Sequence, residues 1–148
     1  MDRRQLLCRA GSALFLLPAL LMGCAQTPPP TPLTGTEWIL AELPGQSLPA
    51  AGARPTLMLA GEPLRATGGA GVNNFVGTVQ MAGAGGLTFG PLATTRRAGA
   101  PQAMQLEAAY LAALAAARTF RTGPGTLELL DAAGRVVVRY ATVAAPGR

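Results

Sequence analysis

The chain has 148 residues, enough for one domain with appendages, and carries a formal net charge of +5. It contains no His and all 12 of its basic residues are Arg, so the usual general base, the imidazole metal ligand and the Schiff-base lysine are missing. These gaps exclude most enzyme classes, and we expect no catalytic activity, no cofactor and no metal site. The arginines are scattered, whereas nucleic-acid ligands need a concentrated basic face, so we expect no nucleic-acid partner.

Residues 1–23 have the layout of a secretory signal peptide, with an Arg-bearing start, an apolar run from Ala10 to Met22 and small residues at its end. The run is shorter than the about 20 residues that a permanent membrane-spanning helix needs. The segment from Asp2 to Leu7 resembles the twin-arginine export signal, but two arginines equally supply the positive charge of an ordinary signal peptide. Both interpretations stay open, and both lead out of the cytoplasm.

The segment Leu21-Met22-Gly23-Cys24 resembles the lipobox of bacterial lipoproteins, in which the cysteine sulfur receives diacylglycerol and cleavage follows before it. The alternative is a buried apolar cysteine in an uncleaved helix, which the polar, proline-rich sequence after it disfavours. We predict lipidation at Cys24 and, because three acyl chains bind far more tightly than one, an effectively permanent membrane anchor.

Ala25 to Pro32, A-Q-T-P-P-P-T-P, cannot pair its proline nitrogens in a sheet and is predicted to be extended. At about 3.1 Å per residue these residues hold the domain roughly 25 Å from the lipid, and together with Cys24 they form a predicted tether at residues 24–32. Ala25 lacks the aspartate that commonly signals retention in the inner membrane of Gram-negative bacteria. We therefore expect a lipid-anchored protein of the cell envelope, on the periplasmic face of the outer membrane.

The domain that follows alternates apolar and polar residues between turn signals, which predicts β-strands. Trp38 lies in the first of them and is predicted to anchor the core rather than form a ligand platform. Asn73 lies in a glycine-rich turn and is predicted to bond nearby backbone rather than a ligand. The predicted strands are Glu37–Leu43, Thr56–Leu59, Leu64–Thr67, a central antiparallel set within residues 68–99, Thr119–Thr122, Thr126–Leu130 and Val136–Tyr140.

One helix is predicted, from Pro101 to Ala117, in an alanine-rich segment with proline acceptable in its first turn. At 100° per residue its apolar side chains form one stripe that packs on the sheet. Glu107 falls at the centre of this stripe, where a bare carboxylate would be costly, so it must find a partner. The stripe consists of Met104, Leu106, Tyr110, Leu111 and Leu114.

Three motifs follow one another in the glycine-rich stretch: G-x-N-x-F-x-G from Gly71, L-T-F-G-P-L from Leu87 and T-T-R-R-A-G from Thr94. They precede P-x-A-M-x-x-E-x-x-Y-L-x-x-L from Pro101. In this order and spacing they resemble the META domain, also called the HslJ-like domain, and the resemblance opens with L-T-G-T-E-W-I-L from Leu33. We therefore expect a META domain at residues 33–143 and a frayed tail at residues 144–148.

The family pattern has an arginine where Arg96 stands and a glutamate where Glu107 stands. We predict that these two residues form an ion pair between helix and sheet, rather than a catalytic acid or a ligand anchor. The family typically has cysteines where this chain has Val72 and Gly99; if they are bonded in relatives, their joint loss leaves no orphan thiol. The motif residues that we expect to hold the fold are Trp38, Asn73, Phe75, Gly77, Thr95, Arg96 and Glu107.

The predicted fold is α+β: a strongly twisted, partly closed, largely antiparallel sheet with one packed helix. The resemblance implies a non-enzymatic envelope lipoprotein in heat-shock or envelope stress tolerance, because the family is associated with such phenotypes. The alternative is a tethered periplasmic binding module, either a carrier of a small apolar ligand or an inhibitor of a periplasmic enzyme. A roomy apolar cavity under the helix would favour the carrier, and a filled core would favour protein binding. We expect a monomer whose partners are the membrane, through Cys24, and an envelope protein or apolar ligand.

Overall fold

Eight strands and one helix form the part of the chain that the computed structural model describes, residues 29–50 and 52–142. The predicted signal peptide, Cys24, most of the tether and the tail lie outside these residues. The elements are β1 (Glu37–Glu42), β2 (Thr56–Ala60), β3 (Arg65–Gly69), β4 (Asn74–Ala82), β5 (Gly86–Thr94), α1 (Pro101–Ala116), β6 (Thr119–Gly123), β7 (Thr126–Leu130) and β8 (Val136–Thr142).

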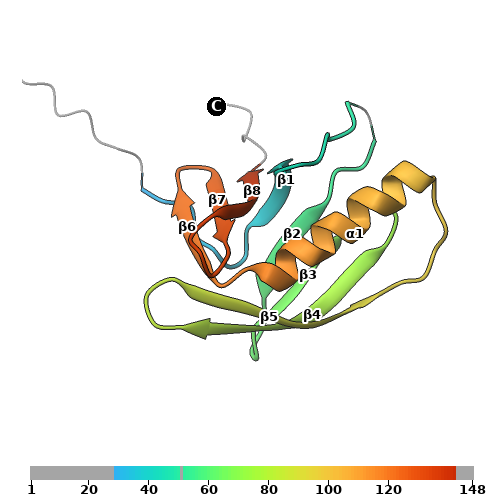
Figure 1. Cartoon of the computed structure of the whole chain (residues 1–148). Helices are drawn as coiled ribbons and strands as arrows, with labels where there is room; N and C mark the ends of the chain where they lie inside the picture. Colours follow the sequence, from blue (N-terminus) through green and yellow to red (C-terminus); the bar gives the residue numbers. More distant parts are fainter. Residues whose placement is uncertain (1–28, 51, 143–148) are drawn as a thin grey trace, which may run out of the picture.

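Each strand pairs antiparallel with its neighbour in sequence, and β1 also pairs with β8, so the sheet closes into a barrel (Figure 1). The closure is thinnest between β5 and β6, which share one registered pair, Gly86 with Thr119. Two backbone hydrogen bonds of 2.9 Å, donated by Leu87 and Phe120, complete this seam. The predicted α+β fold is confirmed, and the ring is more complete than the partial closure expected, because β8 returns to β1.

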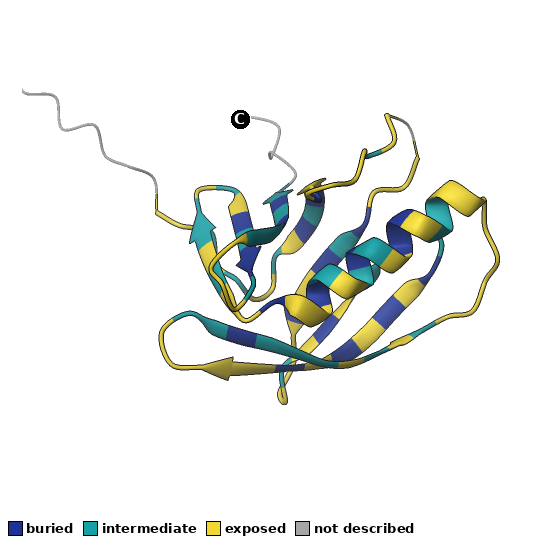
Figure 2. Cartoon of the chain, viewed as in Figure 1, coloured by how far each residue is buried: buried dark blue, intermediate teal, exposed yellow. Residues whose placement is uncertain are grey.

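Buried and exposed residues alternate along the strands, so that one face of each strand lies in the core (Figure 2). In β4, Phe75, Gly77 and Val79 are buried and the residues between them are exposed. A Cβ at Gly77 would lie 2.5 Å from Cδ2 of Leu92, next to a shift in the β4–β5 register. This glycine of the motif therefore lets β5 approach closely.

The helix α1 begins at Pro101, where the missing N–H would have had no helical partner. Leu106, Tyr110 and Leu114 of the predicted stripe are buried, and Glu107 is buried with them, as the periodicity predicted. This face packs against β5 and β8 and covers one side of the barrel (Figure 1). Within the described residues no helix is both long and apolar enough to cross a membrane.

Large side chains fill the space between α1 and the sheet. Trp38 is fully buried, and its Nε1–H donates to the carbonyl oxygen of Leu33 at 3.1 Å, so its predicted role as a core anchor is confirmed. The core is continuous from the barrel strands to the helix. Its largest fully buried members are Trp38, Leu40, Pro55, Leu57, Leu59, Leu87, Tyr110, Leu114, Leu127, Leu129, Val138 and Tyr140.

The segment that precedes β1, residues 29–36, is fastened to the barrel, and we call it the strap. The Thr31 N–H donates to the carbonyl oxygen of Gly123 at 3.0 Å, and Thr31 Oγ1 accepts the Gly125 N–H at 2.8 Å. Further along, the Gly35 N–H donates to the carbonyl oxygen of Leu59 at 2.9 Å. The strap therefore runs from the turn between β6 and β7 to β2 before β1 begins.

Candidate functional site

Glu107 is the only carboxylate with a buried side chain in the described residues, with 6% of its surface exposed. Its Oε2 accepts the backbone N–H groups of Val72, at 3.2 Å, and Asn73, at 2.8 Å. Its Oε1 accepts the Asn73 Nδ2–H at 2.8 Å. Three N–H donors from the turn between β3 and β4 thus surround the carboxylate, so both of its oxygens are hydrogen-bonded.

The side chain of Asn73 also forms hydrogen bonds to residues just after β5. Its Oδ1 accepts the Thr95 Oγ1–H at 2.9 Å and the Arg97 N–H at 2.7 Å, while its Nδ2 also donates to the Arg97 carbonyl oxygen at 3.1 Å. Thr95 Oγ1 in turn accepts the Asn74 N–H at 3.1 Å. We call Val72, Asn73, Thr95, Arg97 and Glu107 the junction, because they join the β3–β4 turn, the segment after β5 and α1.

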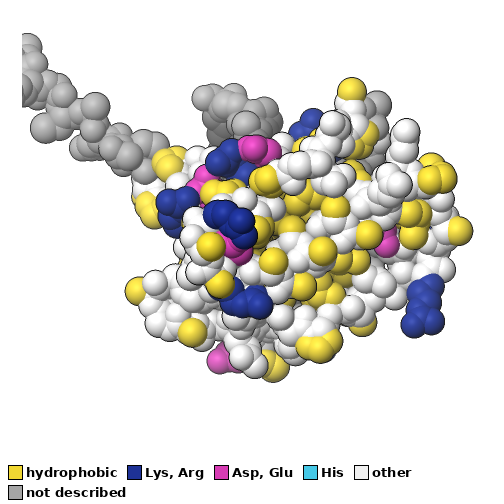
Figure 3. Space-filling model, viewed as in Figure 1, with side chains coloured by type: hydrophobic (Ala, Val, Ile, Leu, Met, Phe, Trp, Pro, Cys, Tyr) yellow, Lys and Arg dark blue, Asp and Glu magenta, His cyan; other side chains and the backbone are white. Residues whose placement is uncertain are grey.

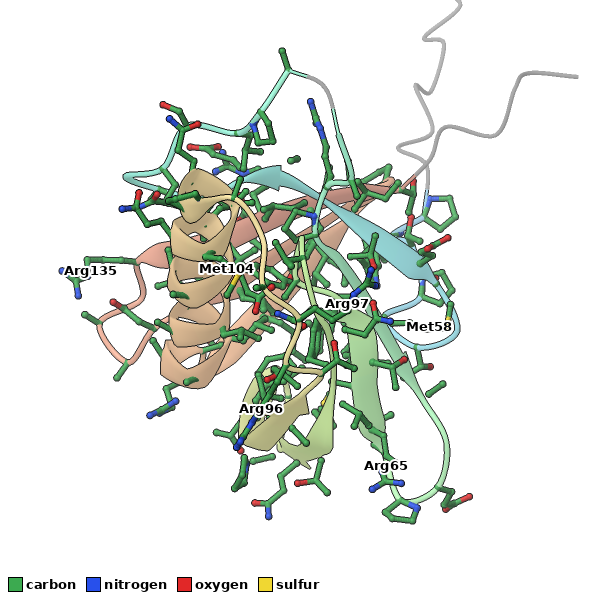
Figure 4. The ribbon with its side chains drawn as sticks, turned by 90° about the vertical axis from the view of Figure 1, so that its right-hand side faces the viewer. Met58, Arg65, Arg96, Arg97, Met104 and Arg135 are labelled. Carbon is green, nitrogen blue, oxygen red and sulfur yellow. The ribbon has the colours of Figure 1, made fainter. Side chains whose placement is uncertain are left out.

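The predicted ion pair between Arg96 and Glu107 is wrong. Arg96 is exposed and takes part in none of the four ion pairs among the described residues (Figure 4). The reason lies in the backbone of Arg97, which turns both its N–H and its carbonyl toward Asn73 and leaves the preceding side chain in solvent. Backbone donors meet the carboxylate without the cost of burying a guanidinium.

The other motif residues separate into two groups. Asn73, Thr95 and Glu107 meet in the junction, whereas Trp38, Phe75 and Gly77 lie in the core of the barrel. Asn73 was predicted to bond nearby backbone, but its side chain instead bonds segments that are distant in sequence. No side chain in the described residues has a buried nitrogen or oxygen without a hydrogen-bond partner.

A pair of buried tyrosines was not anticipated from the sequence. The Tyr110 hydroxyl donates to the Thr56 carbonyl oxygen at 3.1 Å and lies 2.9 Å from the Tyr140 hydroxyl. The Tyr110 ring also packs edge-on against Phe75, with centroids 6.0 Å apart. Burial raises the pKa of both tyrosines, so both stay neutral over the physiological range. Their apolar neighbours in sequence suggested core positions but not this bond between α1, β2 and β8.

Val72 and Gly99, the two positions where the resemblance implies cysteines in relatives, pack directly on each other. A Cβ at Gly99 would lie 2.6 Å from Cγ2 of Val72 and 3.3 Å from its Cβ. The missing side chain at Gly99 therefore makes room for the valine methyl groups. The Cβ to Cβ separation is a few tenths of an ångström below the range of about 3.5–4.5 Å that disulfides adopt.

A surface groove of about 760 Å³ lies beside the junction. Its walls are the loop after β1, including Leu48 and Pro49, and the first turns of α1, including Gln102 and Gln105. Val72 of the junction lines it as well. None of the lining residues is charged, so the groove is suited to contacts with apolar groups and amides. In residues 29–50 and 52–142 no three His, Cys, Asp or Glu side chains gather as a metal site would require.

Comparison with known proteins agrees with this architecture. The sequence model of the META domain family matches residues 31–144. One solved NMR structure is 23% identical, with a TM-score of 0.58 over 74% of this chain and 91% of its own. A second NMR structure, of a protein from Burkholderia xenovorans, is 25% identical, with a TM-score of 0.59 over 87% of this chain and 100% of its own. No functionally curated protein matches the chain.

Proposed function

The chain belongs to the META domain family, and from that premise we propose that it is a non-enzymatic lipoprotein of the cell envelope that acts in stress tolerance. The observation that supports a non-catalytic role is the state of the junction. Both oxygens of Glu107, both polar atoms of the Asn73 side chain and Thr95 Oγ1 are engaged with one another or with backbone. A carboxylate that serves as a general acid or base needs access to a substrate, whereas these groups hold three segments together.

Anchoring rests on the sequence before the domain. The lipobox-like segment ends at Cys24, and the proline-rich residues after it lead directly to Thr31, where the strap is fastened to the barrel. Only about six residues then separate Cys24 from the docked part of the chain, a reach of roughly 19 Å at about 3.1 Å per residue. We propose that the domain faces the periplasm from the outer membrane at this short distance.

The anchor can be tested by replacing each cysteine of the precursor. Because the thioether forms on the Cys24 sulfur, Cys24→Ser is expected to leave a precursor that keeps residues 1–23, while Cys8→Ser should be processed like the parent chain. Intact mass and detergent partitioning of the membrane fraction measure both steps. Equal processing of the two variants would refute the anchor, and turnover of a defined envelope metabolite by the purified chain would refute the non-enzymatic role.

A second candidate function is binding of an envelope protein. The core under α1 is filled by Trp38, Tyr110 and Tyr140 among others, which disfavours a carrier of small apolar ligands. The uncharged groove beside the junction instead offers a surface for a segment of another protein, such as an enzyme that the domain would inhibit.

This candidate predicts crosslinking that depends on position. A photoreactive residue at Gln105, which lines the groove, should capture one envelope protein, and the same residue at Ala112, exposed on α1 away from the groove, should not. Crosslinking in cells followed by mass spectrometry gives the readout. Equal capture at both positions, or a small molecule that co-purifies in native mass spectrometry, would rule out this form of binding.

A further inference from the structure

The outer face of the sheet carries an apolar row across three strands. Met58 of β2 pairs with Thr67 of β3, and Thr67 pairs with Val76 of β4, so these side chains point to the same side. Met58 is 37% exposed and Val76 is 39% exposed, which makes them two of the three large apolar side chains exposed in the described residues. Ala93 of β5 extends the row. We call these four residues the outer row.

Unpaired positive charge flanks the outer row. Arg65, at the start of β3, and Arg97, in the segment after β5, are exposed and take part in none of the ion pairs among the described residues. Both lie with Met58 on the side of the sheet away from α1 (Figure 4). The four strands β2 to β5 contain no Asp or Glu. Nothing on these strands therefore neutralises the two guanidinium groups.

The opposite half of the barrel is arranged differently. Glu128 of β7 pairs with Arg121 of β6 and Arg139 of β8 at 3.0 Å each, and Arg139 also pairs with Glu42 of β1. Basic and acidic side chains are intermixed over this region (Figure 3). Residues 52–100 contain four arginines and one glutamate, a net charge of +3, and the rest of the described chain has four arginines and five carboxylates, a net charge of −1. The positive charge is therefore segregated to the half that bears the outer row.

We propose that the outer row, together with Arg65 and Arg97, is a docking surface for anionic phospholipid headgroups. Guanidinium groups bind phosphate oxygens through paired N–H donors, and exposed Met and Val side chains enter the boundary between headgroups and acyl chains. The inference rests on the proposed lipid anchor in one respect: the anchor keeps the domain within roughly 19 Å of the bilayer. At this short reach the effective lipid concentration is high, so a few weak contacts suffice to lay the domain on the membrane.

The test measures protection of the outer row in vesicles. The full chain with Val76→Cys is reconstituted into vesicles of phosphatidylglycerol and phosphatidylethanolamine, and into neutral phosphatidylcholine vesicles. A membrane-impermeant maleimide should react about fivefold more slowly in the anionic vesicles, because the positive face is drawn to them. Ala112→Cys, exposed on α1, is the matched control and should react equally in both. The parent chain gives the background from Cys8 and Cys24.

Two further conditions test whether the charges of Arg65 and Arg97 cause the protection. Protection of Val76→Cys should disappear in about 1 M salt, where the Debye length falls to about 3 Å, and in the Arg65→Gln/Arg97→Gln background. Equal rates in the two lipid compositions would overturn the proposal. Protection in both compositions would point to a second copy of the chain as the occupant, and protection that survives the arginine changes would show that charge does not drive docking; either result also overturns it.

The intact mass of the same preparation reports separately on the anchor. If Cys24 carries no lipid, the proposed anchor is wrong, and the chain is instead added to an excess of each vesicle type. The difference in Val76→Cys labelling between anionic and neutral lipid still decides whether the outer face binds headgroups.

Discussion

Glu107→Ala is expected to lower the free energy of unfolding by about 3–5 kcal/mol. The substitution removes the acceptor for three N–H groups, those of Val72 and Asn73 in the backbone and Nδ2–H of Asn73. Each stranded buried donor costs about 1–3 kcal/mol, and the space left by the carboxylate adds to this cost. Glu107→Gln keeps one acceptor but brings an NH₂ group against the donors, so we expect an intermediate loss. Urea unfolding of both variants gives the numbers.

Two controls separate this network from an ion pair. Gln105→Ala lies on the exposed side of the same helix and should change stability by no more than about 0.5 kcal/mol. Arg96→Ala should be equally silent, because the Arg96 side chain is exposed and holds no ion pair. A loss at Arg96 as large as that at Glu107 would show that the two residues pair in solution, contrary to the structure.

The double variant Val72→Cys/Gly99→Cys is expected to form a disulfide that stabilises the domain by about 3.5 kcal/mol. The valine Cβ and a Cβ at position 99 would be 3.3 Å apart, so a shift of a few tenths of an ångström brings them into disulfide range. The bond would close a loop of roughly 28 residues and so restrict the unfolded chain. The measurement is urea unfolding of the oxidised and reduced forms of the same protein, in a chain whose Cys8 and Cys24 are replaced by Ser.

Gly99→Ala supplies the matched test of the packing. Its Cβ would lie 2.6 Å from Val72 Cγ2, so the single variant should be destabilised, and adding Val72→Ala should recover part of the loss. Two thiols that stay free under oxidising conditions, or a Gly99→Ala variant as stable as the parent, would mean that the two positions are not in contact.

Local patterns in the sequence were enough to place most of the fold. Alternation placed the strands, and the 3.6-residue period placed Leu106, Glu107, Tyr110 and Leu114 on the buried face of α1. Such local patterns could not predict that β1 and β8 close the ring, because this closure depends on pairing between the two ends of the domain. The glycine punctuation predicted a central antiparallel set within residues 68–99, but not that it consists of two long strands, β4 and β5.

The site was predictable in its residues but not in its bonds. The period of α1 shows that the Glu107 carboxylate is buried, and burial shows that it needs a partner. The partners of this carboxylate are mostly backbone N–H groups, which every residue except proline carries. The residue types in the sequence therefore do not indicate which N–H groups will bind it. A nearby arginine can be recognised in a sequence as a partner for a buried carboxylate, whereas a turn that directs its backbone N–H groups at the carboxylate cannot. The same limit hid the bond between Tyr110 and Tyr140, which joins residues far apart in the chain.

The strap gives an anchored domain a way to bear mechanical force. If Cys24 carries lipid as proposed, a pull on that end of the chain first loads Thr31, whose bonds to Gly123 and Gly125 precede every strand in the path of the load. If these yield, the Gly35 bond to Leu59 is next, and only then does tension reach β1. Release of residues 31–36 would lengthen the tether by roughly 20 Å at about 3.3 Å per residue while the barrel stays closed. Under the proposed anchor, the strap would therefore supply extra length when the membrane moves, before any strand of the barrel is pulled.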